Sequence, residues 1–308
     1  MRLITRSDFD GLACAALLEE HGVIDDYLFV HPKDMQDGKV QVTGNDVLAN
    51  VPFVPGCGMW FDHHSSEEER LAENERIVFK GASYRAPSCA RVIYDHYGGA
   101  KTFWKFDENG LMDAVDKSDS GSLTEDEIRN PKDWILLSFV MDPRTGLGRF
   151  KDYRISNHAL MKDMIRYCRT LSIDEILALP DVKERVERYF EQEKAYQAML
   201  QAHSRVEGKV LVIDLRSVDE ILSGNRFMEY ALWPQANVSV RVLWGREKQN
   251  VVLTVGHSIL DRSCLVDVGS LMLRYGGGGH RQVGTCQVEA AKAEQVLAEV
   301  VATLQQAG

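Results

Sequence analysis

The first half of the chain alternates short apolar strands with helices, and this alternation constrains the fold more than any other feature. Residues Arg2 to Thr5 are expected to form a strand, and Gly11 to His21 a helix whose apolar side chains face inward. Further strand and helix patterns follow, at residues 27–31, 58–61, 88–97, 110–117 and through much of 132–205. Such alternation favours a parallel sheet with helices on both faces, and therefore an α/β fold.

The length of 308 residues is too great for one compact core, so two domains are expected. The stretch 182–205 is charged, lacks Gly and Pro, and carries apolar residues at helical spacing, which predicts a long connecting helix. After Gly208 the strand and helix patterns start again. We therefore place a first domain at 1–190, a helical linker at 191–207 and a smaller α/β domain at 208–308.

Charge balance, cysteine spacing and apolar content argue against several classes of protein. The chain has 36 Lys and Arg residues against 46 Asp and Glu residues, a net charge of −10, which argues against broad binding to duplex nucleic acid. A few local cations can still hold a small anionic substrate. The six cysteines form no C-x-x-C pair, which favours reduced thiols over a disulfide framework or a zinc site. With no signal-peptide core and no apolar run near the ~18 residues of a membrane span, we expect a cytoplasmic protein.

Polar motifs follow two of the predicted strands. Asp8-Phe9-Asp10-Gly11 lies at the start of a predicted helix, and Asp62-His63-His64 follows an apolar run. In an open α/β sheet, ligands gather at the carboxyl ends of the strands. Paired carboxylates suit a hard cation, and imidazole is a common ligand of transition metals. The alternative for both motifs is an Asp that caps a helix, with exposed neighbours.

A third motif is the run of four glycines at 276–279, followed by His280. Its backbone N–H groups have no side chains in the way, which suits the close approach of a phosphate. Four glycines are costly in backbone entropy, which argues against the alternative of a flexible loop.

In this order, the three motifs resemble the DHH phosphoesterase superfamily with its associated C-terminal domain, in particular the exopolyphosphatase-like branch. The resemblance covers nearly the whole chain. It implies an N-terminal parallel-sheet DHH domain, a smaller C-terminal α/β substrate domain, and an active site in the cleft between them. It also implies a hydrolase that cleaves phosphoanhydride or phosphodiester bonds with a metal-activated water. The implied substrate is small and anionic: short polyphosphate, a short oligonucleotide or a cyclic dinucleotide.

The resemblance assigns roles to individual residues. It implies one or two divalent ions, usually Mn²⁺ with Mg²⁺ as the alternative, and Asp8, Asp10 and His63 as ligands. A further ligand is either Asp116 or Asp119, and the choice stays open. His64 would contact the scissile phosphate or protonate the leaving group, and Asp62 would orient its neighbours. The implied substrate-binding residues of the C-terminal domain are Arg226, Arg262, Gly277, Gly278, Gly279 and His280.

The sequence departs from the family pattern at two places. Many members carry a His where this chain has Ile4, and the Asp that normally bridges both metals is best matched by Asn50. Either Asp46, Asp34 or Asp37 substitutes for that bridging Asp, or the protein holds one metal. These departures motivate a second hypothesis, a regulatory protein that binds phosphate or nucleotide without hydrolysing it.

Two further interpretations concern the surroundings of the site and the assembly. The segment 31–38 leaves a predicted strand at the same edge of the sheet, so it forms either part of the active-site wall or a polar surface loop. The pattern is also compatible with a homodimer. A processive single-strand exonuclease is disfavoured by the acidic balance and by the lack of an added nucleic-acid-binding module.

Overall fold

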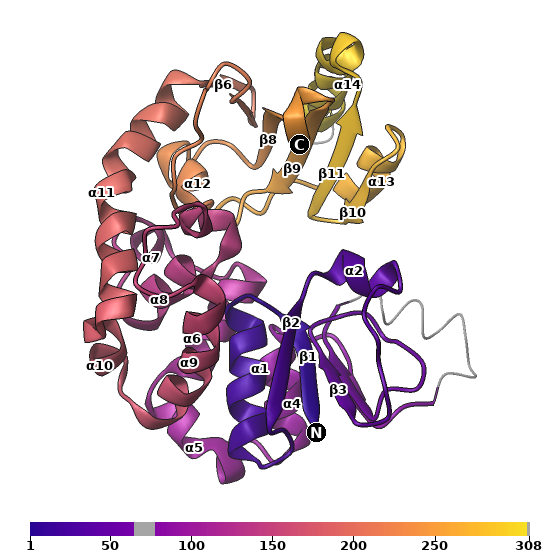
Figure 1. The fold of residues 1–308 in the computed structure, drawn as a ribbon. Helices are drawn as coiled ribbons and strands as arrows, with labels where there is room; N and C mark the ends of the chain where they lie inside the picture. The colour runs from indigo at the N-terminus through magenta and orange to yellow at the C-terminus, as the bar shows by residue number, and fades with distance from the viewer. Residues whose placement is uncertain (65–77, 307–308) are drawn as a thin grey trace. The chain divides into compact units, whose positions relative to one another are not determined.

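The structure, a computed structural model, describes residues 1–64 and 78–306. The chain divides into two compact units (Figure 1). Unit 1 comprises residues 1–122 and 131–189, and unit 2 comprises residues 123–130 and 190–308. Each unit contains one β-sheet, so the expected α/β class is confirmed.

Unit 1 is built on a five-stranded sheet in the order β2-β1-β3-β4-β5, and all four neighbouring pairs are parallel. The strands are β1 (Arg2–Arg6), β2 (Asp26–Val30), β3 (Asp46–Ala49), β4 (Met59–Asp62) and β5 (Gly81–Ser83). From β1 the chain continues to β2 on one side and then to β3 on the other, so the direction of winding reverses at β1 and β3. Ligands of open α/β sheets bind at such a switch point, outside the carboxyl ends of the strands.

Helix α1 (Phe9–Glu20) is the central helix of unit 1. Every residue from Phe9 to Leu18 is buried, because α1 contacts β1 as well as other helices (Figure 1). The sequence predicted only one inward face, and a helix that is apolar on all sides is typical of such a central position. Its neighbours are α4 (Cys89–His96), α6 (Leu111–Ser120) and α9 (Asn157–Thr170). Among its described residues, unit 1 also contains α2 (Pro32–Gln36), α5 (Ala100–Glu108), α8 (Asp133–Met141) and α10 (Ile173–Ala178).

A second apolar cluster packs against the sheet of unit 1. Ile4, Leu48 and Trp60, from the three central strands, are buried there together with Met35 of α2. The Trp60 indole donates a hydrogen bond to the Val51 carbonyl at 2.9 Å. Ile4 therefore belongs to the core, in agreement with its apolar side chain.

Unit 2 contains a six-stranded sheet in the order β10-β11-β9-β8-β7-β6, in which only the β7–β8 pair is parallel. Its strands are β6 (Ser204–Glu207), β7 (Val210–Asp214), β8 (Val238–Trp244), β9 (Val251–His257), β10 (Gly278–His280) and β11 (Val283–Val288). Alternate valines of β8 and β9 are buried against α14 (Ala293–Gln306) and α13 (Val268–Leu273). The unit also contains α12 (Met228–Leu232) and α7 (Glu125–Arg129).

Three features differ in detail from the sequence-based expectation. The long helix α11 (Pro180–Ala202) starts earlier than predicted, and its residues divide between the two units. Residues 123–130, including α7, group with unit 2 although they lie far away in the sequence. The glycine run is partly a strand, β10, where a loop was expected. Within the described residues, no helix is long and apolar enough to cross a membrane.

Candidate metal centre

The first acidic pair lies where β1 leads into α1. Asp8 is the N-cap of α1, and its Oδ1 accepts a hydrogen bond from the Gly11 amide at 3.0 Å. A Cβ atom at position 11 would collide with the Arg6 carbonyl, so only glycine permits this close turn. Asp8 can cap the helix and also contact a ligand, because its Oδ2 faces Arg6 and takes no part in the cap.

Asp10 lies in the first turn of α1 and accepts hydrogen bonds from the N-terminus of another helix. Its Oδ1 accepts from the Ala90 amide at 2.8 Å and its Oδ2 from the Cys89 amide at 3.0 Å, both in the first turn of α4. Burial and the negative charge of Asp119 nevertheless raise the pKa of Asp10 to about 7. The surroundings of Asp10 therefore contain too little positive charge to stabilise its ionised carboxylate, and a bound cation would supply that charge.

His63 follows β4 and faces two acids. Its Nδ1 donates to the Ala86 carbonyl at 3.2 Å, because a carbonyl can only accept. Nε2 then carries a lone pair, and it lies 3.2 Å from Asp119 Oδ2 and 3.8 Å from Asp10 Oδ2. Ligand atoms of these three residues all lie within 4.8 Å of one another. A histidine fixed through one nitrogen and open at the other is typical of metal sites.

The structure separates the two candidates of α6. Asp119, in the last turn, faces His63. Asp116 instead accepts from Ser88 Oγ at 2.7 Å and from Arg91 Nε and Nη2 at 2.8 and 2.6 Å. Its carboxylate is thus neutralised by a bidentate arginine. The geometry brings Asp119, and not Asp116, to the cluster.

His64 and Asp62 form a separate pair beside the cluster. His64 Nδ1 lies 2.8 Å from Asp62 Oδ1, and Asp62 is buried at the end of β4. Burial acts to lower the pKa of His64, but the hydrogen bond to Asp62 and its charge outweigh that effect, so the pKa is raised. His64 can therefore carry a proton near neutral pH.

Asn50 follows β3, between the two motif-bearing strands. It is 1% exposed, and its backbone has a φ of 57°. Its Nδ2 donates to Asp8 Oδ1 at 3.2 Å, while Oδ1 is buried without a hydrogen-bond partner among the described residues. The side chain that replaces the usual bridging Asp therefore lies beside the first acidic loop.

The three proposed substitutes for a bridging Asp lie elsewhere. Asp46 opens β3, at the end opposite to Asn50, and accepts from Arg2 Nε at 2.7 Å and from the Thr43 amide at 2.6 Å. Asp34 and Asp37 pair with lysines of α2 and the turn behind it. None of them belongs to the cluster of Asp10, His63 and Asp119, and a ligand role for Asp46 stays a prediction.

The residues at the cluster fit a divalent cation. His63 Nε2 in the cluster, and Asn50 Oδ1 and Asp62 Oδ2 at the ends of the neighbouring strands, are buried and have no hydrogen-bond partner among the described residues. Such atoms are costly in a folded protein unless a ligand satisfies them. Carboxylate oxygens and an imidazole nitrogen together suit Mn²⁺ or a similar ion.

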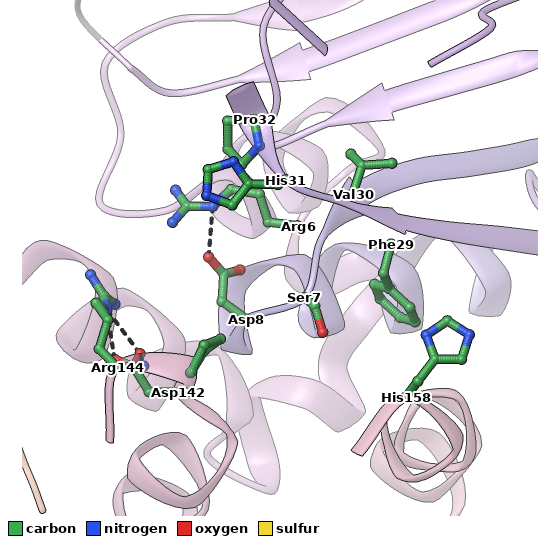
Figure 2. A pocket seen from close by; sticks show the side chains of 11 residues that line it. Arg6, Ser7, Asp8, Phe29, Val30, His31, Pro32, Asp142, Arg144 and His158 are labelled. Atoms are coloured by element: carbon green, nitrogen blue, oxygen red, sulfur yellow. Dashed lines mark hydrogen bonds and ion pairs between the residues drawn. The ribbon is translucent and has the colours of Figure 1, made fainter. Parts of the chain in front are cut away.

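A pocket of about 520 Å³ in unit 1 is lined by Asp8, the N-cap residue that precedes Asp10 by two positions (Figure 2). His31 and Pro32 line this pocket, and a place for the 31–38 segment in the active-site wall stays a prediction. Sequence reasoning missed Asp142 and Arg144, and it gave His158 no functional role. No motif marks these residues, because only the tertiary fold brings their loop and helix beside β1.

The predicted substrate-binding residues belong to unit 2. Gly278 and His280 are part of β10, and a Cβ atom on Gly277 or Gly279 would collide with the β11 backbone. Arg262 Nε donates to the Ile259 carbonyl at 3.3 Å, and the Arg226 guanidinium lies 4.0 Å from the centre of the Phe227 ring. Packing therefore explains two of the glycines, and the proposed phosphate contact remains a prediction for all of these residues.

Relatives of this chain are found among solved structures, whereas no family model and no curated protein matches the sequence. PggH, a pGpG-specific phosphodiesterase from Vibrio cholerae, is 46% identical with a TM-score of 0.84, over 100% of this chain and 99% of that one. The DHH domain of a protein described as a member of a family of ribosomal proteins is 13% identical with a TM-score of 0.58, over 99% of this chain and 86% of that one.

The RecJ protein of Thermus thermophilus in complex with Mn²⁺ is 14% identical with a TM-score of 0.52, over 99% of this chain and 52% of that one. The last two likenesses show the fold alone, and membership of the exopolyphosphatase-like branch stays a prediction. A phosphodiesterase that is 46% identical along its whole length shows the family, and the chain belongs to the DHH superfamily of metal-dependent phosphohydrolases.

Proposed function

We propose that this protein hydrolyses the phosphodiester bond of a small 5′-phosphorylated dinucleotide such as pGpG, with Mn²⁺ as the preferred ion and Mg²⁺ as a substitute. The observation that carries the proposal is the His63 Nε2 lone pair, 3.2 Å from Asp119 and 3.8 Å from Asp10. The 46% identity to a pGpG-specific phosphodiesterase supports the choice of substrate.

The proposed ligands are Asp10, His63 and Asp119, with Asp8 beside them. A bound ion would lower the pKa of a water molecule and neutralise charge on the phosphoryl oxygens. Ala86 holds His63 in the tautomer that leaves Nε2 open. Asp8 and Asp10 are held in turn by backbone amides of α1 and α4, so the ligand set is organised before an ion binds.

His64 is the proposed general acid. Asp62 orients its ring through the 2.8 Å contact to Nδ1 and favours its protonated form. The proton would go to the oxygen that leaves the phosphorus atom as water adds to it.

The number of ions follows from Asn50. A neutral amide oxygen binds a cation less strongly than a carboxylate, so we propose one tight site and one weaker site. We also propose that Arg226, Arg262 and the glycine segment bind the substrate. A cytoplasmic location and a homodimer also stay predictions.

The test is turnover of a defined panel by purified protein. It comprises pGpG, a cyclic dinucleotide and short polyphosphate, each with Mn²⁺, Mg²⁺ or EDTA, and products separated by chromatography. We expect GMP from pGpG with Mn²⁺, none with EDTA, and none from Asp10→Ala. If the protein hydrolysed only polyphosphate, the proposed dinucleotide substrate would be wrong. If it hydrolysed none of the compounds, the proposal that it is an active enzyme would be wrong.

The second candidate is a protein that binds nucleotide without cutting it, which Asn50 favours. Calorimetry separates the two. Tight binding of pGpG that is recovered intact after incubation with Mn²⁺ would support the second candidate.

A further inference from the structure

The pocket beside the metal centre is a distinct site. It is formed within unit 1 by residues Arg6, Ser7, Asp8, Phe29, Val30, His31, Pro32, Asp142, Pro143, Arg144 and His158. Asp8 is the one proposed metal-centre residue among them, since Asp10, His63 and Asp119 do not line the pocket. A ligand that reaches Asp8 can therefore extend from the metal centre into this pocket.

Two arginines approach the pocket in the same way. Arg6 Nε pairs with Asp8 Oδ2 at 3.0 Å, and Arg144 Nε pairs with both oxygens of Asp142, at 2.8 and 3.1 Å. Among the described residues, neither arginine makes a hydrogen bond through its terminal nitrogens. Figure 2 shows both side chains on the same side of the pocket, with Asp8 between them. Each guanidinium is thus held through Nε, which leaves its terminal nitrogens able to donate to a ligand.

Asp142 prepares Arg144 for this role. It caps the short 3-10 helix Pro143–Thr145, and its Oδ1 also accepts from the Arg144 amide at 2.8 Å. The carboxylate therefore holds both the backbone and the side chain of the same arginine. Pre-organising a guanidinium reduces the entropy lost when it binds an anion.

The rest of the wall offers one more donor and an apolar surface. His31 Nδ1 accepts from the Lys33 amide at 3.1 Å, so Nε2 carries the proton and can donate. Phe29 lies edge-on to His158, with 5.9 Å between ring centroids. A ligand with an anionic end and a flat, weakly polar part matches these walls.

We propose that this pocket binds the end nucleotide that carries the terminal 5′-phosphate, with Arg144 and Arg6 holding that phosphomonoester. The inference rests on the proposed function, because it requires a dinucleotide whose internal phosphate lies at the metal centre. Asp8 and Asp142 would repel a phosphate, but each is paired with an arginine through Nε, and the terminal nitrogens of Arg144 and Arg6 remain able to donate. Arg144 is thereby a specificity-determining residue and Asp142 its positioning residue.

The test compares two substrates that differ only in the terminal phosphate, pGpG and GpG. With saturating Mn²⁺, we expect the wild type to prefer pGpG, measured as the ratio of the two kcat/KM values. In Arg144→Gln this ratio should fall about 10- to 100-fold, the range for one charge-assisted contact. Arg144→Lys should recover part of the ratio, since a lysine keeps the charge without the fork. Asp142→Asn should reduce the ratio less than Arg144→Gln does.

Arg154→Gln is the matched control, because Arg154 is an exposed arginine of unit 1 that pairs with Asp181 and does not line the pocket. It should keep the wild-type ratio. An equal loss on pGpG and GpG in Arg144→Gln would place Arg144 on the scissile phosphate and overturn the proposal. So would a wild type that does not distinguish the two substrates.

A binding measurement separates this proposal from the proposed function. Calorimetry of pGpG and GpG with metal-free protein needs no turnover. If the terminal phosphate strengthens binding in the wild type and not in Arg144→Gln, the pocket is supported even where hydrolysis fails. If hydrolysis of pGpG proceeds while Arg144→Gln keeps the full preference, the pocket proposal alone is wrong.

Discussion

The Nε2 atom of His63 lies 3.2 Å from Asp119 Oδ2, although one residue follows a strand and the other lies at the end of a helix. In the neutral ring, Nδ1 carries the proton that it donates to Ala86, so Nε2 presents a lone pair towards the carboxylate. A cation between these two atoms would bind both of them.

Asp119→Asn should lower Mn²⁺ affinity at least ~100-fold, because it removes a charged ligand, whereas Asp116→Asn should keep the affinity within a few-fold. Calorimetric titration with Mn²⁺ measures both. Asp116→Asn should instead lower the free energy of unfolding by about 2 kcal/mol, since Arg91 loses its bidentate partner. The reverse outcome would show that Asp116 is the ligand.

Asn50→Asp should increase the affinity for a second Mn²⁺ ion, because it restores a charged group beside Asp8. Calorimetry and elemental analysis of the dialysed protein would give the stoichiometry. Asn50→Ala serves as the control and should bind no second ion. If Asn50→Asp binds the same number of ions as the wild type, Asn50 is not the bridging position.

Metal removal should make stability depend on pH through Asp10. In the metal-free protein the pKa of this carboxyl is about 7, above its ordinary value of 3.8. The folded state then keeps a proton that the unfolded chain releases, so this contribution to stability is lost as pH rises from about 4 through 7. Thermal unfolding with EDTA should show this trend, and Asp10→Asn should flatten it.

Saturating Mn²⁺ should reverse that dependence, because the ion requires the ionised carboxylate and binds more tightly as pH rises towards about 8. Stabilisation should then follow the ratio of free Mn²⁺ to its dissociation constant. Stabilisation by Mn²⁺ that is equal at about pH 5.5 and about pH 8 would contradict Asp10 as a ligand.

Asp46→Asn should reduce stability by about 2 kcal/mol at neutral pH and leave Mn²⁺ affinity unchanged. Burial acts to raise the pKa of Asp46, but the hydrogen bonds from Arg2 and Thr43 outweigh it, so the pKa is lowered. Its contribution is therefore present above about pH 4 and is lost as pH falls through the lowered value. Urea unfolding at about pH 7 and about pH 3 should show the difference between variant and wild type shrinking. If Asp46→Asn instead weakened Mn²⁺ binding, Asp46 would be a metal ligand.

Gly279→Ala should destabilise the protein by several kcal/mol, because its φ of 156° is unfavourable for other residues and its Cβ would collide with Val283. Gly278→Ala is the matched control, since no described atom lies within 4 Å of its Cβ position. It should leave the melting temperature nearly unchanged. Equal stability of the two variants would mean that the glycine run is not required by packing.

Much of the fold could be predicted from local pattern. The apolar runs and their polar ends indicated β1, β2, β4 and most strands of unit 2, because period and turn chemistry are local properties. Strand β10 was not predicted, since glycine carries no strand preference and its pairing with β11 depends on tertiary contacts. The grouping of 123–130 with unit 2 likewise could not be predicted from the sequence.

The sequence by itself predicted candidate metal ligands and placed Asp8 and His63 just after strands, because alternation and motif are properties of the linear chain. Only the tertiary structure brought Asp119 rather than Asp116 to His63, put Asp46 at the other end of β3, and placed Arg144 in the same pocket lining as Asp8. The physical reason is that position along a helix decides which way an acid points, so Asp119 faces His63 whereas Asp116 faces Arg91. Position along a strand decides which edge of the sheet a residue reaches, and Asp46 and Asn50 lie at opposite ends of β3. The packing of elements that are distant in the sequence sets both.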